Sequence, residues 1–325
     1  MSDRGEHRLH KIINEAIMLL TNKSEYEKMS IFHKEVKRTD MTEKNPVEQI
    51  HVLRPVSGWF DLHLFDLWYY RDLIMLFVRR DFVAVYKQTI LGPLWYLLQP
   101  IMTTIVFTFI FGKIANIPTD GVPPVLFYFA GLTVWSYFSG CLNKTSNTFV
   151  NNAYIFGKVY FPRLSVPVSV VISGLIGLFI QLALFLMILA YYVVQGAAIA
   201  FNPLYLLALP LLIIQIAALS LGFGIIVSSL TTKYRDLAQL VAFGVQLWMY
   251  ATPIAYPSSQ VPARWQWVIA INPMTPVVEM FRFTFLGVGT INSWQIAQSA
   301  ISTVVILFIG IILFSRVEKS FMDTV

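Results

Sequence analysis

Residues 164–232 read LSVPVSVVISGLIGLFIQLALFLMILAYYVVQGAAIAFNPLYLLALPLLIIQIAALSLGFGIIVSSLTT and contain no charged side chain. A helix needs about 20 apolar residues to cross the roughly 30 Å hydrocarbon core of a bilayer. The stretch is long enough for two crossings, and QGAAIAFNP at 195–203 interrupts it. We therefore expect transmembrane helices at about 165–193 and 203–230.

Further apolar segments flank these two helices. They lie at about 94–112, 124–146, 237–256 and 295–315. The sequence thus predicts an all-α integral membrane protein with six transmembrane helices in a domain of residues 93–325.

The composition agrees with a membrane protein. The chain is 56% hydrophobic and 13% charged, whereas a soluble domain carries about 25% charged residues. Residues 1–92 hold 14 Lys/Arg, 13 Asp/Glu and all five His, while residues 93–325 hold 10 Lys/Arg and 5 Asp/Glu. The basic residues of the apolar part stand singly at the ends of apolar runs, so the net charge of +6 does not indicate a nucleic-acid partner.

The orientation follows from the short loops. The first 30 residues lack the apolar core of a signal peptide, so we expect a cytoplasmic N-terminus. An even helix count then returns the C-terminus to the cytoplasm. This orientation agrees with the positive-inside rule, because seven Lys/Arg fall in inside loops and three in outside loops: Lys144, Lys158, Arg163, Lys233, Arg235, Arg316 and Lys319 inside, and Lys113, Arg264 and Arg282 outside.

Residues 66–87 are too charged to span a membrane. Their apolar residues share one helical face, and Asp72, Arg79, Arg80 and Lys87 share another, which predicts an amphipathic helix at the interface. Asp81 falls on the apolar side. We assign 55–92 to a cytoplasmic interface, where this helix is either a peripheral anchor or part of a docking surface.

Residues 258–290 are apolar but broken by three prolines. Each apolar piece is too short to span, so we expect two short helices that meet at Asn272-Pro273 and re-enter the outer leaflet. The alternative is a structured external loop. Glu279 and Arg282 are three residues apart, so on a helix they could pair near an exit. The candidate exit residues are Asn272, Pro273, Glu279 and Arg282.

Residues 1–54 have too little apolar content for a core. We expect a flexible or weakly helical cytoplasmic extension.

Several kinds of chemistry are absent from the sequence. There is no G-x-x-x-x-G-K-[ST] phosphate-binding loop and no H-E-x-x-H pair, and Cys141 is the only cysteine. The expected spans contain no carboxylate, whereas ion-coupled carriers usually bury one. We expect no catalytic residue, no metal site and no enzyme activity on this chain.

An external motor would then supply the energy. The 66–87 helix and the loop 151–163 could dock it, although the loop could also be a simple tether. The candidate contacts are Arg71, Arg79, Arg80, Tyr154, Lys158, Tyr160 and Arg163. Aromatic side chains within the spans could stack on sugar rings along a pathway or form an interface belt; the candidates are Trp95, Tyr96, Trp135, Tyr137, Phe138, Trp248 and Tyr250.

Four sequence blocks resemble one transporter family. They are DLWYYRDLIMLFVRRDFVAVYKQTILGPLWYLLQP, NNAYIFGKVYFPRLSVP, LTTKYRDLAQL and TPIAYPSSQVPARWQWVIAINPMTPVVEMFR, in this order. The resemblance covers about residues 55–316 and is to the permeases that export O antigen, capsule and teichoic acid, which belong to the type-two ABC exporters. Residues 1–54 fall outside it.

The resemblance implies a bacterial inner-membrane transporter subunit. Two copies would form the channel above two separate ATPase subunits that carry ATP and Mg²⁺, and the cargo would be a glycan on an undecaprenyl-type lipid. It places the motor contact at 66–87 and 151–163 and the exit at 258–290. A permease for drugs or small lipids, an ion-coupled flippase and a membrane scaffold remain as alternatives.

Overall fold

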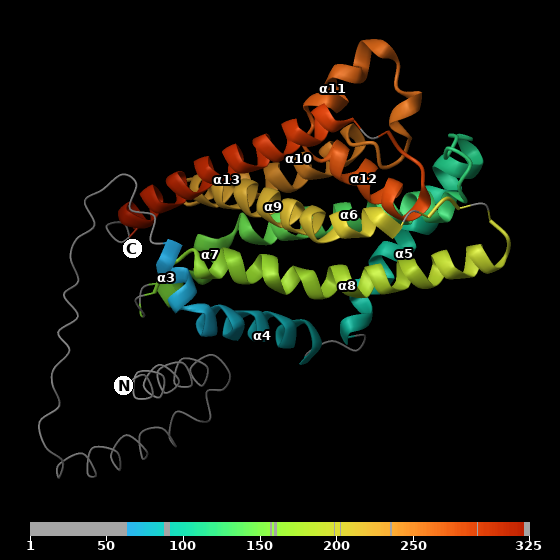
Figure 1. The fold of residues 1–325 in the computed structure, drawn as a ribbon. Helices are drawn as coiled ribbons and strands as arrows, with labels where there is room; N and C mark the ends of the chain where they lie inside the picture. Colours follow the sequence, from blue (N-terminus) through green and yellow to red (C-terminus); the bar gives the residue numbers. More distant parts are fainter. Residues whose placement is uncertain are drawn as a thin grey trace, which may run out of the picture. The chain divides into compact units, whose positions relative to one another are not determined.

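The computed structural model describes residues 64–87, 92–156, 158, 161–197, 199–201, 203–234, 236–290 and 292–321 (Figure 1). Within these ranges every regular element is a helix and none is a strand, which confirms the predicted all-α class. The helices are α3 (Leu64–Tyr69), α4 (Arg71–Lys87), α5 (Trp95–Phe107), α6 (Pro124–Thr145), α7 (Thr148–Phe156), α8 (Ser165–Val194), α9 (Leu209–Thr231), α10 (Leu237–Ala251), α11 (Gln266–Ile271), α12 (Thr275–Leu286) and α13 (Ser293–Phe321). The predicted extension 1–54 lies outside the described residues.

Five of these helical segments are long and apolar enough to cross a membrane. They are Trp95–Ile114, Pro124–Thr145, Ser165–Val194, Tyr205–Thr231 and Ser293–Val317. The first continues α5 through a π-helical stretch, η3 (Thr108–Ile114), and the fourth begins in a 3-10 turn, η4 (Pro203–Ala208).

The helix expected at 237–256 ends five residues early, at Ala251. Its 15 residues reach only about 22 Å at 1.5 Å per residue. Thr252 takes an extended conformation (φ −97°, ψ 139°) because the following Pro253 disfavours a helical residue before it. The last helix, expected at 295–315, is instead longer than predicted, since α13 continues past Arg316 to Phe321.

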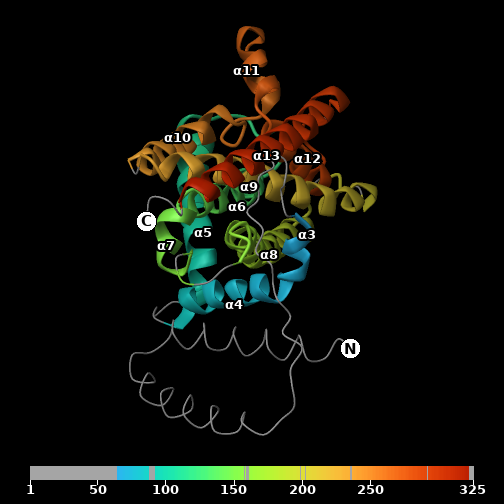
Figure 2. The same cartoon turned by 90° about the vertical axis from the view of Figure 1, so that its left-hand side faces the viewer.

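α6 forms the centre of the bundle. Figure 2 shows it between α8 on one side and α9 with α13 on the other. About 78% of its membrane-length window is buried, against 17% for the first and last segments. α9 and α13 approach closely, because a Cβ on Gly310 would lie 2.8 Å from the carbonyl oxygen of Gly222. Small residues permit such contact between membrane helices.

The amphipathic segment 66–87 consists of α3 and α4, which adjoin at Tyr70. α4 packs on α8 and buries Ile74, Phe77 and Val78. Asp81, which the sequence pattern places on the apolar face of the helix, forms a 2.8 Å ion pair with Arg80. That pairing explains why the helix tolerates a carboxylate there.

The segment 258–290 contains two short helices, α11 and α12, separated by Asn272–Met274, as predicted. α11 projects away from the other helices in both views (Figures 1 and 2). α12 packs into the core instead, where Phe281 and Phe285 contact Phe185 of α8 at ring-centroid distances of 5.8 and 5.4 Å.

Candidate functional site

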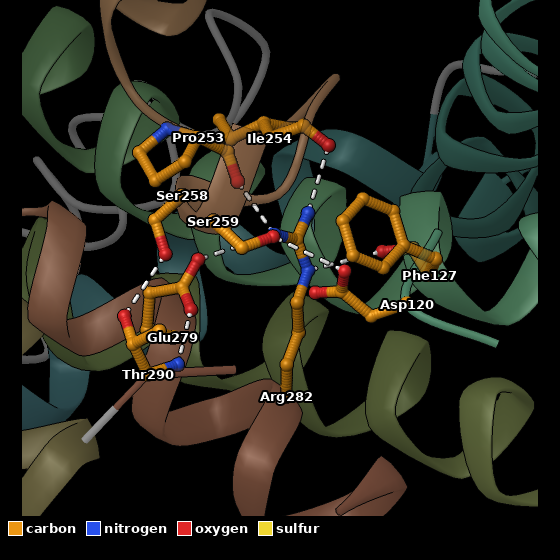
Figure 3. Close-up of polar contacts among 9 residues, drawn as sticks. All are labelled: Asp120, Phe127, Pro253, Ile254, Ser258, Ser259, Glu279, Arg282 and Thr290. Carbon is orange, nitrogen blue, oxygen red and sulfur yellow. Dashed lines mark hydrogen bonds and ion pairs between the residues drawn. The ribbon is translucent and has the colours of Figure 1, made fainter. Parts of the chain in front are cut away.

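Arg282 of α12 is buried, with 1% of its surface exposed, and each of its three guanidinium nitrogens donates to the backbone of another segment (Figure 3). Nε donates to the carbonyl of Phe127 at 3.3 Å, Nη1 to Pro253 at 2.5 Å and Nη2 to Ile254 at 2.8 Å. The guanidinium carbon also lies 3.7 Å from the centre of the Phe127 ring. One side chain thus joins α12 to α6 and to the segment after α10.

Glu279 lies one turn earlier on α12. Its Oε1 is 3.7 Å from Nη1 of Arg282, which confirms the pairing predicted from their spacing. Oε2 accepts a 2.9 Å hydrogen bond from the backbone N–H of Thr290. The Thr290 hydroxyl lies 2.9 Å from that of Ser258, so the charged pair continues into a polar contact between two loops (Figure 3).

Two glycines make room for this pair. A Cβ on Gly131 would lie 2.7 Å from Nη2 of Arg282, so only glycine lets the guanidinium reach the α6 backbone. Gly289 has a φ of +123°, and a Cβ there would lie 2.9 Å from Oε2 of Glu279. The sequence therefore accommodates the charges at two separate positions.

The surroundings of Arg282 compensate its charge. An unpaired buried charge is costly, but here three carbonyls, one carboxylate and an aromatic face replace water. These hydrogen bonds have a structural role: they connect α12 to α6 and to the residues after α10.

Asn272 fixes the same segment from the other side. Its Oδ1 accepts from the Trp248 indole at 3.1 Å and from the Met274 backbone N–H at 3.0 Å. Its Nδ2 donates to the Thr252 hydroxyl at 2.9 Å. We use the name α10 clasp for Asn272, Glu279 and Arg282 together with residues 251–254. The neighbouring carbonyl of Pro273 accepts from Ser299 of α13.

The aromatic candidates divide into buried and exposed groups. Trp135 and Phe138 are buried, and with Phe223 they surround Trp248 at centroid distances of 5.1–6.1 Å. Tyr137 is also buried and donates to the Val171 carbonyl at 3.1 Å.

Three aromatic candidates reach the surface or its edge. Trp95 and Tyr250 are about half exposed. Tyr96 is partly buried, and Gly177 leaves the space that its ring fills, since a Cβ there would lie 2.7 Å from the ring. Among the seven candidates, these three and the partly exposed Trp248 have a surface that another molecule could contact.

The motor-contact candidates lie around a second core. Phe77 of α4 contacts Phe161 at 5.7 Å, and these rings join a cluster with Phe149, Phe156 and Phe314. α4 and the 151–163 loop, predicted separately, are therefore held together.

The individual motor-contact residues differ in exposure. Arg71, Arg79, Tyr154 and Lys158 are exposed, and Arg80 is half-buried against Asp81. Arg163 is 5% exposed and lies 5.5 Å from the Phe156 ring centre, so it packs in the core and presents no charge at the surface. Tyr160 lies outside the described residues.

Sequence reasoning missed the acceptors of Arg282. Phe127, Gly131, Pro253 and Ile254 have no chemistry of their own that marks them. One signal was present: a proline interrupts the chain after α10, and backbone carbonyls outside a helix need donors that a nearby arginine can supply. Among the described residues, no group of His, Cys, Asp or Glu could hold a metal ion.

Comparison with known proteins identifies the family. The family described as ABC-2 type transporter matches residues 72–286, from α4 to the end of α12. The O-antigen export system permease protein RfbA of Klebsiella pneumoniae is 28% identical over 260 residues, covering 80% of this chain and 97% of that protein. The RfbA permease of Myxococcus xanthus is 26% identical over 264 residues, covering 80% and 98%. The polysialic acid transport protein KpsM of Escherichia coli is 23% identical over 235 residues, covering 72% and 89%. The family match spans most of the chain and both candidate regions, so the protein belongs to the ABC-2 type transporter family.

Proposed function

We propose that this chain is the channel-forming subunit of an ATP-driven exporter that moves a lipid-linked polysaccharide outward across the bacterial inner membrane. The observation that carries the proposal is the similarity to O-antigen and polysialic acid export proteins over nearly their whole length. The sequence contains no phosphate-binding loop, so ATP hydrolysis falls to a separate subunit.

In this proposal the chain crosses the membrane six times. α10 is the short crossing, completed by the turn and bend residues 252–256 that follow Ala251. α11 and α12 re-enter the outer leaflet, and the termini are cytoplasmic. Irregular backbone at membrane depth requires burial in protein, and the α10 clasp supplies hydrogen-bond partners for the irregular backbone after α10.

Two copies of the chain would enclose the pathway. α10 supports this, because it exposes Leu240, Phe243, Leu247 and Tyr250 and buries only Val245. A stripe of this kind faces lipid or another subunit. Two ATPase subunits would bind at α4 and α7, where Arg71, Arg79, Tyr154 and Lys158 are exposed.

A permease for drugs or small lipids is the second candidate, and it would share this architecture. An ion-coupled flippase is less well supported, because the five long apolar segments contain no Asp or Glu. The drug or small-lipid permease differs from the proposed exporter in its cargo, and the ion-coupled flippase differs in the energy source that drives transport.

The test is deletion of the gene in the producing bacterium, with complementation by the intact chain. We expect loss of surface polysaccharide and accumulation of the lipid-linked polymer at the inner face. Inactivation of the ATPase subunit should give the same result. Normal surface polysaccharide in the deletion strain would refute the proposal.

A further inference from the structure

A groove of about 600 Å³ opens between residues 115–118, after η3, and residues 251–269, which connect α10 to α11. Asn116, Pro118, Tyr256, Gln260, Pro262 and Trp265 line it, together with six further apolar residues at 115, 117, 251, 261, 268 and 269. Its volume is that of a pocket for a drug-sized molecule. It does not include the charged pair of the α10 clasp.

The groove combines aromatic faces with free amides. Trp265 is 52% exposed, and the Tyr256 hydroxyl donates to the carbonyl of Tyr250 at 3.0 Å, which fixes the ring at the wall. Asn116 and Gln260 are exposed, and no hydrogen bond within the described part of the chain engages either side-chain amide. Both donors and acceptors are therefore available to a ligand.

These features argue against two other ligand types. A phosphate or lipid headgroup needs a cation, and no lining residue is charged; Lys113 and Arg264 lie nearby in the sequence but do not line the groove. A hydrocarbon chain would contact the apolar lining residues but would offer no hydrogen-bond partner to either amide.

We propose that this groove binds neutral sugar units of the exported polymer. Sugar rings present apolar C–H faces to Trp265 and Tyr256 and hydroxyls to Asn116 and Gln260. The absence of a lining cation selects against acidic sugars, whose carboxylates would have no charge partner. The inference rests on the proposed function and adds a class of substrate to it.

The test uses the full chain in nanodiscs and short oligosaccharides prepared by mild acid from the surface polysaccharide of the producing bacterium. Saturation transfer from protein to sugar C–H protons reports binding. We expect transfer in the wild type and a reduction of about fivefold or more in Trp265→Ala and Tyr256→Ala, because an aromatic stacking partner is removed. Trp265→Phe should retain most of the signal. Trp294→Ala is the matched control, since Trp294 is 73% exposed and does not line the groove.

Sialylated oligosaccharides of equal length test the charge selectivity and should bind at least about fivefold more weakly, because the groove offers them no cation. Equal binding of these, no transfer in the wild type, or transfer unaffected by both alanine variants would overturn the inference. The deletion strain separates this from the exporter function. If deletion abolishes surface polysaccharide but the groove variants bind normally, only the groove assignment fails. If deletion leaves surface polysaccharide intact, the exporter function itself fails.

Discussion

Removal of the Arg282 side chain should destabilise the protein strongly and more than removal of Glu279. Arg282→Ala leaves the carbonyls of Phe127, Pro253 and Ile254 without their donor and leaves Glu279 as a buried charge. Breaking a buried charged pair by removing one partner costs about 3–5 kcal/mol. A solvated pair in a loop would contribute only about 0–1 kcal/mol.

Glu279→Ala removes fewer interactions than Arg282→Ala does. The arginine keeps its three carbonyls and the Phe127 ring, and the lost contact is a 3.7 Å ion pair plus one hydrogen bond from Thr290. We expect a loss of about 1–3 kcal/mol, the range for a buried polar group left without its partner. The double variant should recover little, because the carbonyls of Pro253 and Ile254 lose their Arg282 donor in it as well.

The measurement is the free energy of unfolding in detergent micelles or bicelles, followed by protease sensitivity, together with surface polysaccharide at matched protein level. A loss of 3 kcal/mol or more corresponds to roughly a hundredfold change in the folded ratio, which this assay resolves. Lys113→Ala is the control, since that exposed residue lies at the end of η3, away from the clasp. An Arg282→Ala protein as stable as the Lys113→Ala control would refute the reasoning. Recovery in the double variant to wild-type stability would show that the charges matter only to each other and not to the carbonyls.

Other predictions address the partner subunit and the packing. The purified chain should hydrolyse ATP no faster than a preparation without it, and addition of the ATPase subunit should produce the activity; hydrolysis by the chain alone at the rate of a complete transporter would contradict this. Charge reversal of Lys158, or of Arg79 with Arg80, should lower the amount of export per ATP hydrolysed in proteoliposomes at unchanged expression. Arg163→Glu should instead reduce the amount of folded protein, because Arg163 is buried. Equal yields of the Lys158 and Arg163 variants would argue against the burial of Arg163. Gly310→Leu should separate α9 from α13, since even a Cβ would lie 2.8 Å from the Gly222 carbonyl oxygen. We expect the free energy of unfolding to fall by about 1–3 kcal/mol and the thermal midpoint to fall by several degrees. The same change at Gly140, where a Cβ would meet nothing within 4 Å, is the control.

Apolar length predicted the long helices, because a bilayer requires about 20 residues whatever the tertiary contacts are. Residues 164–232 therefore divided correctly into α8 and α9. Helix ends were less predictable. α10 stopped at Ala251 because of Pro253, and α13 continued past Arg316, since a charged residue ends the membrane crossing but does not end a helix.

The candidate site was predictable only where both partners lie on one element. Spacing on a helix was enough to pair Glu279 with Arg282. It could not show that Arg282 binds carbonyls 28, 29 and 155 positions away, because those acceptors are backbone atoms that every residue carries. The glycine that admits the guanidinium, Gly131, is likewise recognisable only from the distance between α6 and α12.

The same limit applies to exposure. Tyr154, Lys158 and Arg163 all lie within residues 151–163, and the sequence alone predicts the same motor-contact role for each. In the structure their exposure differs. Phe156 and Phe161 pack in one cluster with Phe77 of α4, and Arg163 is buried against the Phe156 ring. Tyr154 and Lys158 are exposed to solvent. The motor contact that we propose would therefore rest on the exposed residues, and Arg163 packs inside the segment that presents them.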